Sequence, residues 1–283
     1  MPSSAEPPAA THHPIAVVGA GTLGRRLALM FASGGAEVRI TDPVPGQIAE
    51  AVEFVSGHAA HAPGRVVAAD SVKAAVDGAW LVVEAVPERL ELKKWVFAEL
   101  DRLTGSEVVL ASNSSSFPTS RLIDGLAFPE RVLNTHFYLP PLINAVEVMS
   151  SGRTSRAVMD KVLGALPEFG FTPLEVRAES TGFIYNRIWA AVKREALAVV
   201  AEGVATPEEV DLIYRLVVGV SSGPFRVMDQ VGLDVVLDIE NQYAAERDGL
   251  PEGPRGLLRE YVGRGHLGVK SGRGFYNDYR EGS

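Results

Sequence analysis

Apolar residues in the first 180 positions gather into short runs of strand length, separated by segments in which they recur every three or four positions. Continuous apolar runs are typical of strands buried on both faces of a parallel sheet, and the intervening spacing is that of amphipathic helices. The expected strands are residues 15–18, 37–41, 65–69, 80–86, 107–110, 131–135, 145–149 and 173–176. The expected helices are residues 25–33, 47–58, 72–76, 88–103 and 155–169. This alternation predicts an α/β fold with a doubly wound, mostly parallel sheet.

The pattern changes near Ala178, beyond which long helical segments follow one another without a further strong strand. A helix is expected from Thr181 to about Ala201. Thr206 and the residues up to Glu209 form a capping box with proline at the first helical position, which predicts the start of the next helix. That helix breaks at 222–225, and helix is expected again over 227–245. We therefore predict a disordered tail (1–14), an α/β domain (15–178) and an all-helical domain (179–283).

The composition narrows the classes of function. Hydrophobic residues make up 46% of the 283 positions and charged residues 22%, as in ordinary soluble proteins. The net charge of −8 argues against a nucleic-acid partner, which requires clustered cations. No apolar run reaches the roughly 18 residues of a membrane helix. The chain has no cysteine, which excludes disulfides and thiol catalysis. The first fourteen residues lack the layout of a signal peptide, so a cytoplasmic protein is expected.

A glycine-rich turn directly follows the first strand. The sequence Gly19-Ala20-Gly21-Thr22-Leu23-Gly24 stands between strand and helix, where such a turn binds the pyrophosphate of a dinucleotide. The first glycine permits a tight turn, the second lets the phosphates approach the backbone, and the third allows close packing of helix on strand. The second strand ends at Asp42, whose carboxylate suits the ribose hydroxyls and repels a 2′-phosphate. These features predict a Rossmann-type domain that binds NAD rather than NADP.

Polar side chains also stand at the ends of later strands. Residues 111–116 form a run of small hydroxyl residues at the carboxyl end of a strand, where ligands of doubly wound sheets bind, although the run also suits a helix cap. His136 ends one strand and Glu147 lies in the next. Two such strands can bring the histidine and the glutamate within hydrogen-bonding distance, which fixes the ring tautomer and suits a general base. By itself, such a pair is more often structural than catalytic.

Seven segments along the chain are similar to those of a known family: GAGTLG, VVEAVPERLELKK, ASNSSS, NTHFYLPP, STGFIYNRI, SSGPFRVMDQVGLD and GVKSGRGFY. In this order they resemble the L-3-hydroxyacyl-CoA dehydrogenases, including the short 3-hydroxybutyryl-CoA type. The resemblance covers nearly the whole chain after the tail.

The resemblance implies roles for individual residues. The histidine of the family segment H-F-F-N-P matches His136, which takes the proton of the 3-hydroxyl group as hydride passes to the nicotinamide. Glu147 matches the glutamate that orients this histidine. Ser115 and Asn186 match the serine and asparagine that hold the substrate oxygen, and Ser115 also lies at the cofactor.

The family's cofactor contacts match two further residues. They are Glu88 and Lys93, although a surface pair would have the same spacing. The substrate implied is a small acyl compound, and the helical domain is where relatives form homodimers. No metal site is expected, since His58 and His61 lack matching ligands.

The chain departs from the family in three places. Leu139 replaces an asparagine near the nicotinamide, and the segment between histidine and glutamate is one residue shorter. The basic helical hairpin that holds the CoA nucleotide is replaced by a shorter segment, 43–64, without lysine or arginine. Glu50 and Glu53 there would repel the anionic CoA.

Several alternatives remain open. The substrate is a CoA thioester, a carrier-protein thioester, or a small free acid of the gulonate or carnitine type. A non-catalytic NAD-binding protein, as among the crystallin relatives, is a further hypothesis. A lysine base is the least compatible alternative, because Lys193 is better explained by a solvated helix face.

Overall fold

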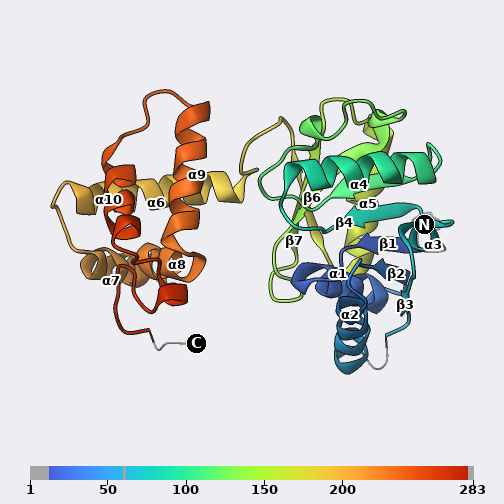
Figure 1. Ribbon diagram of the computed structural model, residues 1–283, viewed down its shortest axis with the longest axis horizontal. Helices are drawn as coiled ribbons and strands as arrows, with labels where there is room; N and C mark the ends of the chain where they lie inside the picture. Colours follow the sequence, from blue (N-terminus) through green and yellow to red (C-terminus); the bar gives the residue numbers. More distant parts are fainter. Residues whose placement is uncertain (1–12, 60–61, 280–283) are drawn as a thin grey trace, which may run out of the picture. The chain divides into compact units, whose positions relative to one another are not determined.

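The computed structural model describes residues 13–59 and 62–279, which fold as two compact units, Met1–Ile184 and Tyr185–Ser283 (Figure 1). Apart from His13 and Pro14, the predicted tail lies outside the described residues. Pro14 is fixed to the sheet, because its carbonyl oxygen accepts a hydrogen bond from the Trp80 backbone N–H (3.1 Å). Within the described residues, no helix combines the length and apolar character that a bilayer crossing requires.

The N-terminal unit is built on one eight-stranded sheet with the order β3-β2-β1-β4-β5-β6-β7-β8. Every neighbouring pair is parallel except β6 and β7, which are antiparallel. The predicted mostly parallel, doubly wound fold is therefore confirmed. The strands are β1 (Ile15–Val18), β2 (Glu37–Thr41), β3 (Arg65–Ala68), β4 (Leu81–Glu84), β5 (Val109–Ser112), β6 (Val132–Phe137), β7 (Ala145–Ser150) and β8 (Thr172–Val176).

Helices cover both faces of this sheet (Figure 1). Helices α1, α2 and α5 contribute to one apolar core, and α3 and α4 contribute to the other. The Ser155 hydroxyl caps α5 by accepting a hydrogen bond from the Val158 N–H. The helices are α1 (Thr22–Ser33), α2 (Pro45–His58), α3 (Val72–Val76), α4 (Leu90–Leu103) and α5 (Arg156–Ala165). The 3₁₀ turns are η2 (Thr119–Arg121), η3 (Pro129–Arg131) and η4 (Leu166–Phe169).

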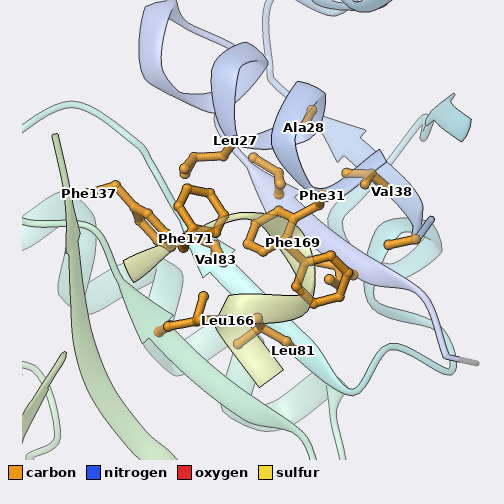
Figure 2. Packing of buried hydrophobic residues seen from close by; sticks show 14 of the residues in the cluster. Leu27, Ala28, Phe31, Val38, Leu81, Val83, Phe137, Leu166, Phe169 and Phe171 are labelled. Atoms are coloured by element: carbon orange, nitrogen blue, oxygen red, sulfur yellow. The ribbon is translucent and has the colours of Figure 1, made fainter. Parts of the chain in front are cut away.

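An aromatic cluster holds β6 in place. Figure 2 shows Phe31 of α1 among the rings of Phe137, Phe169 and Phe171, with centroid distances of 6.2, 5.2 and 5.5 Å. Burying one phenyl ring stabilises a fold by roughly 1.5–3 kcal/mol. Because side chains alternate along a strand, anchoring Phe137 in this core directs the side chain of the preceding residue, His136, to the opposite face of the sheet.

The C-terminal unit is helical, as predicted, but its helix boundaries differ from the prediction. The helix expected from Thr181 begins only at Tyr185, and the segment expected over 227–245 is divided at Gly232, whose φ is +104°. The capping box at Thr206 is confirmed. The helices are α6 (Tyr185–Ala201), α7 (Pro207–Val218), α8 (Pro224–Val231), α9 (Leu233–Glu246) and α10 (Gly253–Gly263), followed by η5 (Val269–Ser271).

Candidate functional site

The glycine-rich loop after β1 leaves its backbone accessible at its middle residue. A Cβ atom on Gly19 would lie 2.5 Å from the Ala85 carbonyl oxygen, and one on Gly24 would lie 1.9 Å from the Gly19 carbonyl oxygen. A Cβ atom on Gly21 would meet no atom within 4 Å. The outer glycines therefore permit close packing, while the space at Gly21, beside the first turn of α1 with Thr22 and Leu23, suits a pyrophosphate.

Asp42 lies at the carboxyl end of β2 and organises the adjoining loop. Its Oδ2 accepts a hydrogen bond from the Ala20 N–H and its Oδ1 accepts one from the Val44 N–H, both at 2.9 Å. Asp42 and Gly21 line a cavity of about 640 Å³, whose apolar wall includes Val86 and Trp95. An apolar cavity with a carboxylate at its edge fits the adenosine half of NAD.

A buried ion cluster lies behind this cavity. The Lys93 ammonium group is 2.8 Å from Glu84 Oε1 and 3.1 Å from Glu88 Oε2. Ser112 Oγ donates to Glu84 Oε2 (2.7 Å), and Ser114 Oγ donates to Glu88 Oε1 (2.5 Å). Lys93 is fully buried whereas Glu88 is exposed, so the two are not the surface pair that their spacing allowed.

The cluster has opposite effects on its two carboxyl groups. Burial raises the pKa of Glu84, and the nearby Lys93 charge only partly offsets this effect. Burial also opposes ionisation of Glu88, but the Lys93 charge and the Ser114 hydrogen bond outweigh it, so the pKa of Glu88 is lowered. The sequence contained a signal for this cluster, since Glu84 interrupts an apolar strand and a buried carboxylate requires a partner.

The hydroxyl run after β5 divides into buried and exposed members. Ser114 is buried against Glu88, whereas Ser115 is exposed. No hydrogen bond joins the Ser115 side chain to another residue within the described ranges. Ser115 is therefore the hydroxyl of this pair that remains available to a ligand.

His136 and Glu147 form a direct cross-strand pair between β6 and β7. His136 Nδ1 lies 2.9 Å from Glu147 Oε2, and both side chains are buried. Hydrogen bonding of Nδ1–H to the carboxylate leaves the Nε2 lone pair as the proton acceptor. Within the part of the chain that the structure describes, Nε2 has no hydrogen bond, so this nitrogen is available to a substrate.

Three neighbours that sequence reasoning missed surround the pair. The Tyr138 hydroxyl donates to Glu147 Oε2 (2.8 Å), and the Ile184 backbone N–H donates to Glu147 Oε1 (2.8 Å). The Phe183 ring stacks on the His136 ring with a centroid distance of 4.8 Å. Phe183 has a φ of +54°, the left-handed region that side chains rarely adopt. Asn186 follows in the first turn of α6.

The surroundings of α2 contain cations despite the composition of segment 43–64. The guanidinium groups of Arg25 and Arg26 on α1 lie 5.2 and 5.7 Å from the centre of the Phe54 ring of α2. Arg26 and Phe54 line a cavity of about 410 Å³ together with Leu139, the residue at the asparagine position of the family. Segment 43–64 itself has no lysine or arginine, but α1 places two arginines beside it.

The interpretation of Lys193 as a residue on a solvated helix face is also wrong. Its side chain is only 5% exposed within the helical unit. Burial lowers its pKa, and the charge of Glu240 opposes this shift. Glu240 lies 47 positions further along the chain, so local spacing gave no signal for this burial.

Comparisons with known proteins agree with these features. The model of the 3-hydroxyacyl-CoA dehydrogenase NAD-binding domain matches residues 14–180, and the model of the C-terminal domain of 3-hydroxyacyl-CoA dehydrogenase matches residues 182–278. A probable 3-hydroxybutyryl-CoA dehydrogenase of Bacillus subtilis (strain 168) is 33% identical over 282 residues, covering 94% of this chain and 97% of that protein.

Two further relatives are similar over most of their length. The 5-formyl-3-hydroxy-2-methylpyridine 4-carboxylate 5-dehydrogenase of Mesorhizobium japonicum is 30% identical over 280 residues, covering 93% of this chain and 89% of that protein. The crystal structure of (S)-3-hydroxybutyryl-CoA dehydrogenase from Ralstonia eutropha has a TM-score of 0.87 at 29% identity, covering 95% and 99% of the two chains. With both of its domains matched, the chain belongs to the 3-hydroxyacyl-CoA dehydrogenase family.

Proposed function

We propose that this protein interconverts an L-3-hydroxyacyl compound and its 3-keto form, with His136 exchanging the proton of the substrate oxygen. Family membership establishes the broader class, an NAD-dependent oxidoreductase acting on a CH–OH group. The observation that supports the proposal most directly is the 2.9 Å hydrogen bond from His136 Nδ1 to Glu147, which leaves Nε2 as the proton acceptor.

In the oxidation direction, neutral His136 Nε2 accepts the proton of the 3-hydroxyl group. NAD supplies the hydride acceptor for this reaction. The resulting imidazolium is stabilised by the adjacent Glu147 carboxylate, which keeps its negative charge throughout. In the reduction direction, the imidazolium returns this proton to the 3-keto oxygen.

The remaining site residues act by binding. Ser115 and Asn186 hold the substrate oxygen, as their match to the family's serine and asparagine implies, and the exposure of Ser115 after β5 supports its part. Gly19, Gly21, Thr22, Leu23 and Gly24 bind the pyrophosphate, and Asp42 binds the adenosine ribose. Glu88, Lys93 and Ser115 complete the cofactor side. The proposal assigns NAD binding to the domain predicted over 15–178, and substrate binding and dimerisation to the domain predicted over 179–283, whereas the compact units of the structure meet between Ile184 and Tyr185.

The first substrate class to consider is a CoA thioester, because two of the relatives are named for 3-hydroxybutyryl-CoA. Arg25 and Arg26 supply cations that an anionic handle can use. A second class, a small free acid, is favoured by the absence of lysine and arginine in segment 43–64. The relative named for a pyridine carboxylate points in the same direction. A carrier-protein thioester is the third class.

In the decisive experiment, the oxidation of NADH is followed by its absorbance, with purified protein and either acetoacetyl-CoA or acetoacetate as the compound to be reduced. Oxidation of NADH with the thioester alone supports the CoA class, and oxidation with acetoacetate alone supports the small-acid class. If NADH binds but neither compound is reduced, two hypotheses remain: the substrate is bound to a carrier protein, or the protein binds NAD without catalysis.

The same proposal includes a cytoplasmic homodimer that associates through the helical domain. Four large apolar residues of α7 are more than half exposed in the single chain: Leu212 (53%), Ile213 (58%), Leu216 (72%) and Val217 (76%). Such a patch is typical of an interface. Leu216→Glu should convert a dimer into a monomer in sedimentation experiments, and a wild-type mass near 30.2 kDa would reject the dimer.

A further inference from the structure

We infer that Tyr138 is a positioning residue whose hydroxyl group sets how strongly Glu147 holds a proton on His136. The inference rests on the proposed function of the His136–Glu147 pair. It concerns a residue at which this chain differs from the family segment H-F-F-N-P, since the second phenylalanine of that segment is a tyrosine here.

Strand geometry places the three side chains together. Tyr138 follows His136 by two positions, so the two side chains leave the same face of the chain. Their ring centroids are 4.6 Å apart. The Tyr138 hydroxyl lies 2.8 Å from Glu147 Oε2, the same oxygen that lies 2.9 Å from His136 Nδ1. A carboxylate oxygen has two lone pairs and accepts both hydrogen bonds at once.

The second donor changes the electrostatics of the pair. A phenol hydrogen bond withdraws part of the negative charge that Glu147 otherwise directs at the imidazole. The imidazolium is consequently less stabilised than it would be beside the same carboxylate without the Tyr138 hydrogen bond, and the neutral, proton-accepting ring is favoured. The Tyr138 hydroxyl therefore adjusts the balance between oxidation, which starts from neutral His136, and reduction, which starts from the imidazolium.

The role of Tyr138 is separable from that of holding the carboxylate in place. The Ile184 N–H already anchors the other carboxylate oxygen at 2.8 Å. The contacts described around the His136 ring within the N-terminal unit come from Glu147 on β7, Tyr138 after β6, and Phe183 after β8. Of these groups, only Glu147 and Tyr138 titrate, and the Phe183 ring is neutral.

The test measures kcat/KM as a function of pH for wild type and Tyr138→Phe, in the oxidation direction and in the reduction direction. The substrates are the 3-hydroxy and 3-keto forms of either the CoA thioester or the free acid, whichever the wild type turns over. Without the hydroxyl group the imidazolium is more stable. The midpoint of the oxidation profile should therefore move to higher pH by about half to one unit, and reduction should persist to correspondingly higher pH. The KM for NADH should stay within about twofold of the wild-type value, because the cofactor contacts are unchanged.

A second variant separates the hydroxyl group from the ring. Tyr138→Leu also lacks the hydroxyl, so it should show the same displacement of the midpoint. A displacement with leucine but not with phenylalanine would assign the effect to ring packing and overturn the inference. Superimposable profiles for wild type and both variants would overturn it as well.

Tyr276→Phe in the helical unit is a matched control. It removes a phenol hydroxyl that also donates to a carboxylate, Asp211 Oδ2, at 2.9 Å. This variant should leave the pH profile in place. If the wild type turns over neither of these substrates nor an acetoacetyl carrier-protein thioester, the proposed function fails and the inference fails with it. If the wild type is active and the profiles coincide, only the inference fails.

Discussion

The N-terminal unit contains two clusters built around a buried carboxylate. Each pairs the carboxylate with a nitrogen base, but we propose different roles for them. Glu84 is fully buried beside Lys93, and Glu147 is almost fully buried beside His136. In the first cluster the partner is the ammonium group of Lys93, which lies between two carboxylates. In the second the partner is the imidazole of His136, to which the proposed function assigns the exchange of a proton with the substrate.

Under the proposed function, the comparison implies that the burial of a carboxylate does not by itself mark a catalytic residue. What separates the clusters is then whether the partner of the carboxylate has an atom that can exchange a proton with a substrate. Both clusters have additional donors to their carboxylates, from Ser112 and Ser114 in the first and from Tyr138 and the Ile184 N–H in the second. The His136 pair keeps one ring nitrogen without a protein partner in the described ranges, and that nitrogen can serve a reaction.

The largest effect is expected from removing the titrating partner. His136→Gln keeps a side chain that can hydrogen-bond to Glu147 but cannot act as a base, so kcat should fall by about 10³-fold. NADH binding, followed by fluorescence, should be retained. His266→Gln in the helical unit is the matched control. A His136→Gln enzyme with wild-type kcat would remove His136 from the mechanism and end the contrast between the clusters.

Removing the fixed cation should damage folding. Lys93→Met leaves Glu84 buried without its charge partner, which should lower the free energy of unfolding by about 3–5 kcal/mol in urea denaturation. Burial raises the pKa of Glu84, so its protonated form is favoured in the folded state. The loss in free energy of unfolding caused by Lys93→Met should therefore grow as pH rises through the folded-state pKa of Glu84 and shrink at acidic pH.

Lys94→Met, which removes a half-exposed lysine paired with Glu91, is the control for Lys93→Met and should change stability by less than about 1 kcal/mol. Equal stability of the two variants would mean that the buried cluster is not needed for folding. The Lys93 cluster could then no longer be called structural, and the comparison between the two clusters would fail.

The smallest effect is expected at Lys193, which extends the comparison to a buried lysine without an ion-paired carboxylate among the described residues. No hydrogen bond or ion pair joins Lys193 to another residue among those described, and burial lowers its pKa from the ordinary 10.5. Lys193→Met should therefore raise the free energy of unfolding at pH 7 by about 1 kcal/mol.

The sign of this effect fixes its pH dependence. Burial lowers the pKa of Lys193 in the folded state, so over part of the pH range the unfolded chain binds a proton that the folded chain does not. The free energy of unfolding of the wild type therefore rises as pH rises from the folded pKa of Lys193 towards 10.5. The advantage of Lys193→Met should shrink over the same range in thermal denaturation. A loss of stability at pH 7 would instead show that the charge of Glu240 makes Lys193 favourable.

Much of the fold could be predicted from the sequence because its signals are local. The apolar strands, the glycine-rich turn and the capping box at Thr206 each depend on residues within a few positions of one another. The fifth strand was predicted over 107–110 but spans Val109–Ser112, since serine and alanine carry little strand signal. The helix α10 was missed, and its sequence opens with glycine and proline.

The candidate site was predictable to a smaller extent. The distance of eleven positions between His136 and Glu147 suggested a pair, but nothing in the sequence singled out Tyr138, because its partner lies on the next strand. The start of α6 was misplaced for a similar reason. Tertiary contacts at Phe183 and Ile184, with His136 and Glu147, compete there with helix formation. Long-range contacts of this kind leave no local pattern.

The direct register of His136 opposite Glu147 also bears on how the protein can be re-engineered. The residues from Leu139 to Asn144 lie outside the β6–β7 ladder, which ends at Phe137 and Val146. Their number can therefore change without shifting the two strands by one position, a slip that would turn the histidine to the other face. A library of loops with different lengths and compositions, inserted between Tyr138 and Ala145, should sample new substrate preferences while the proton-transfer machinery stays intact.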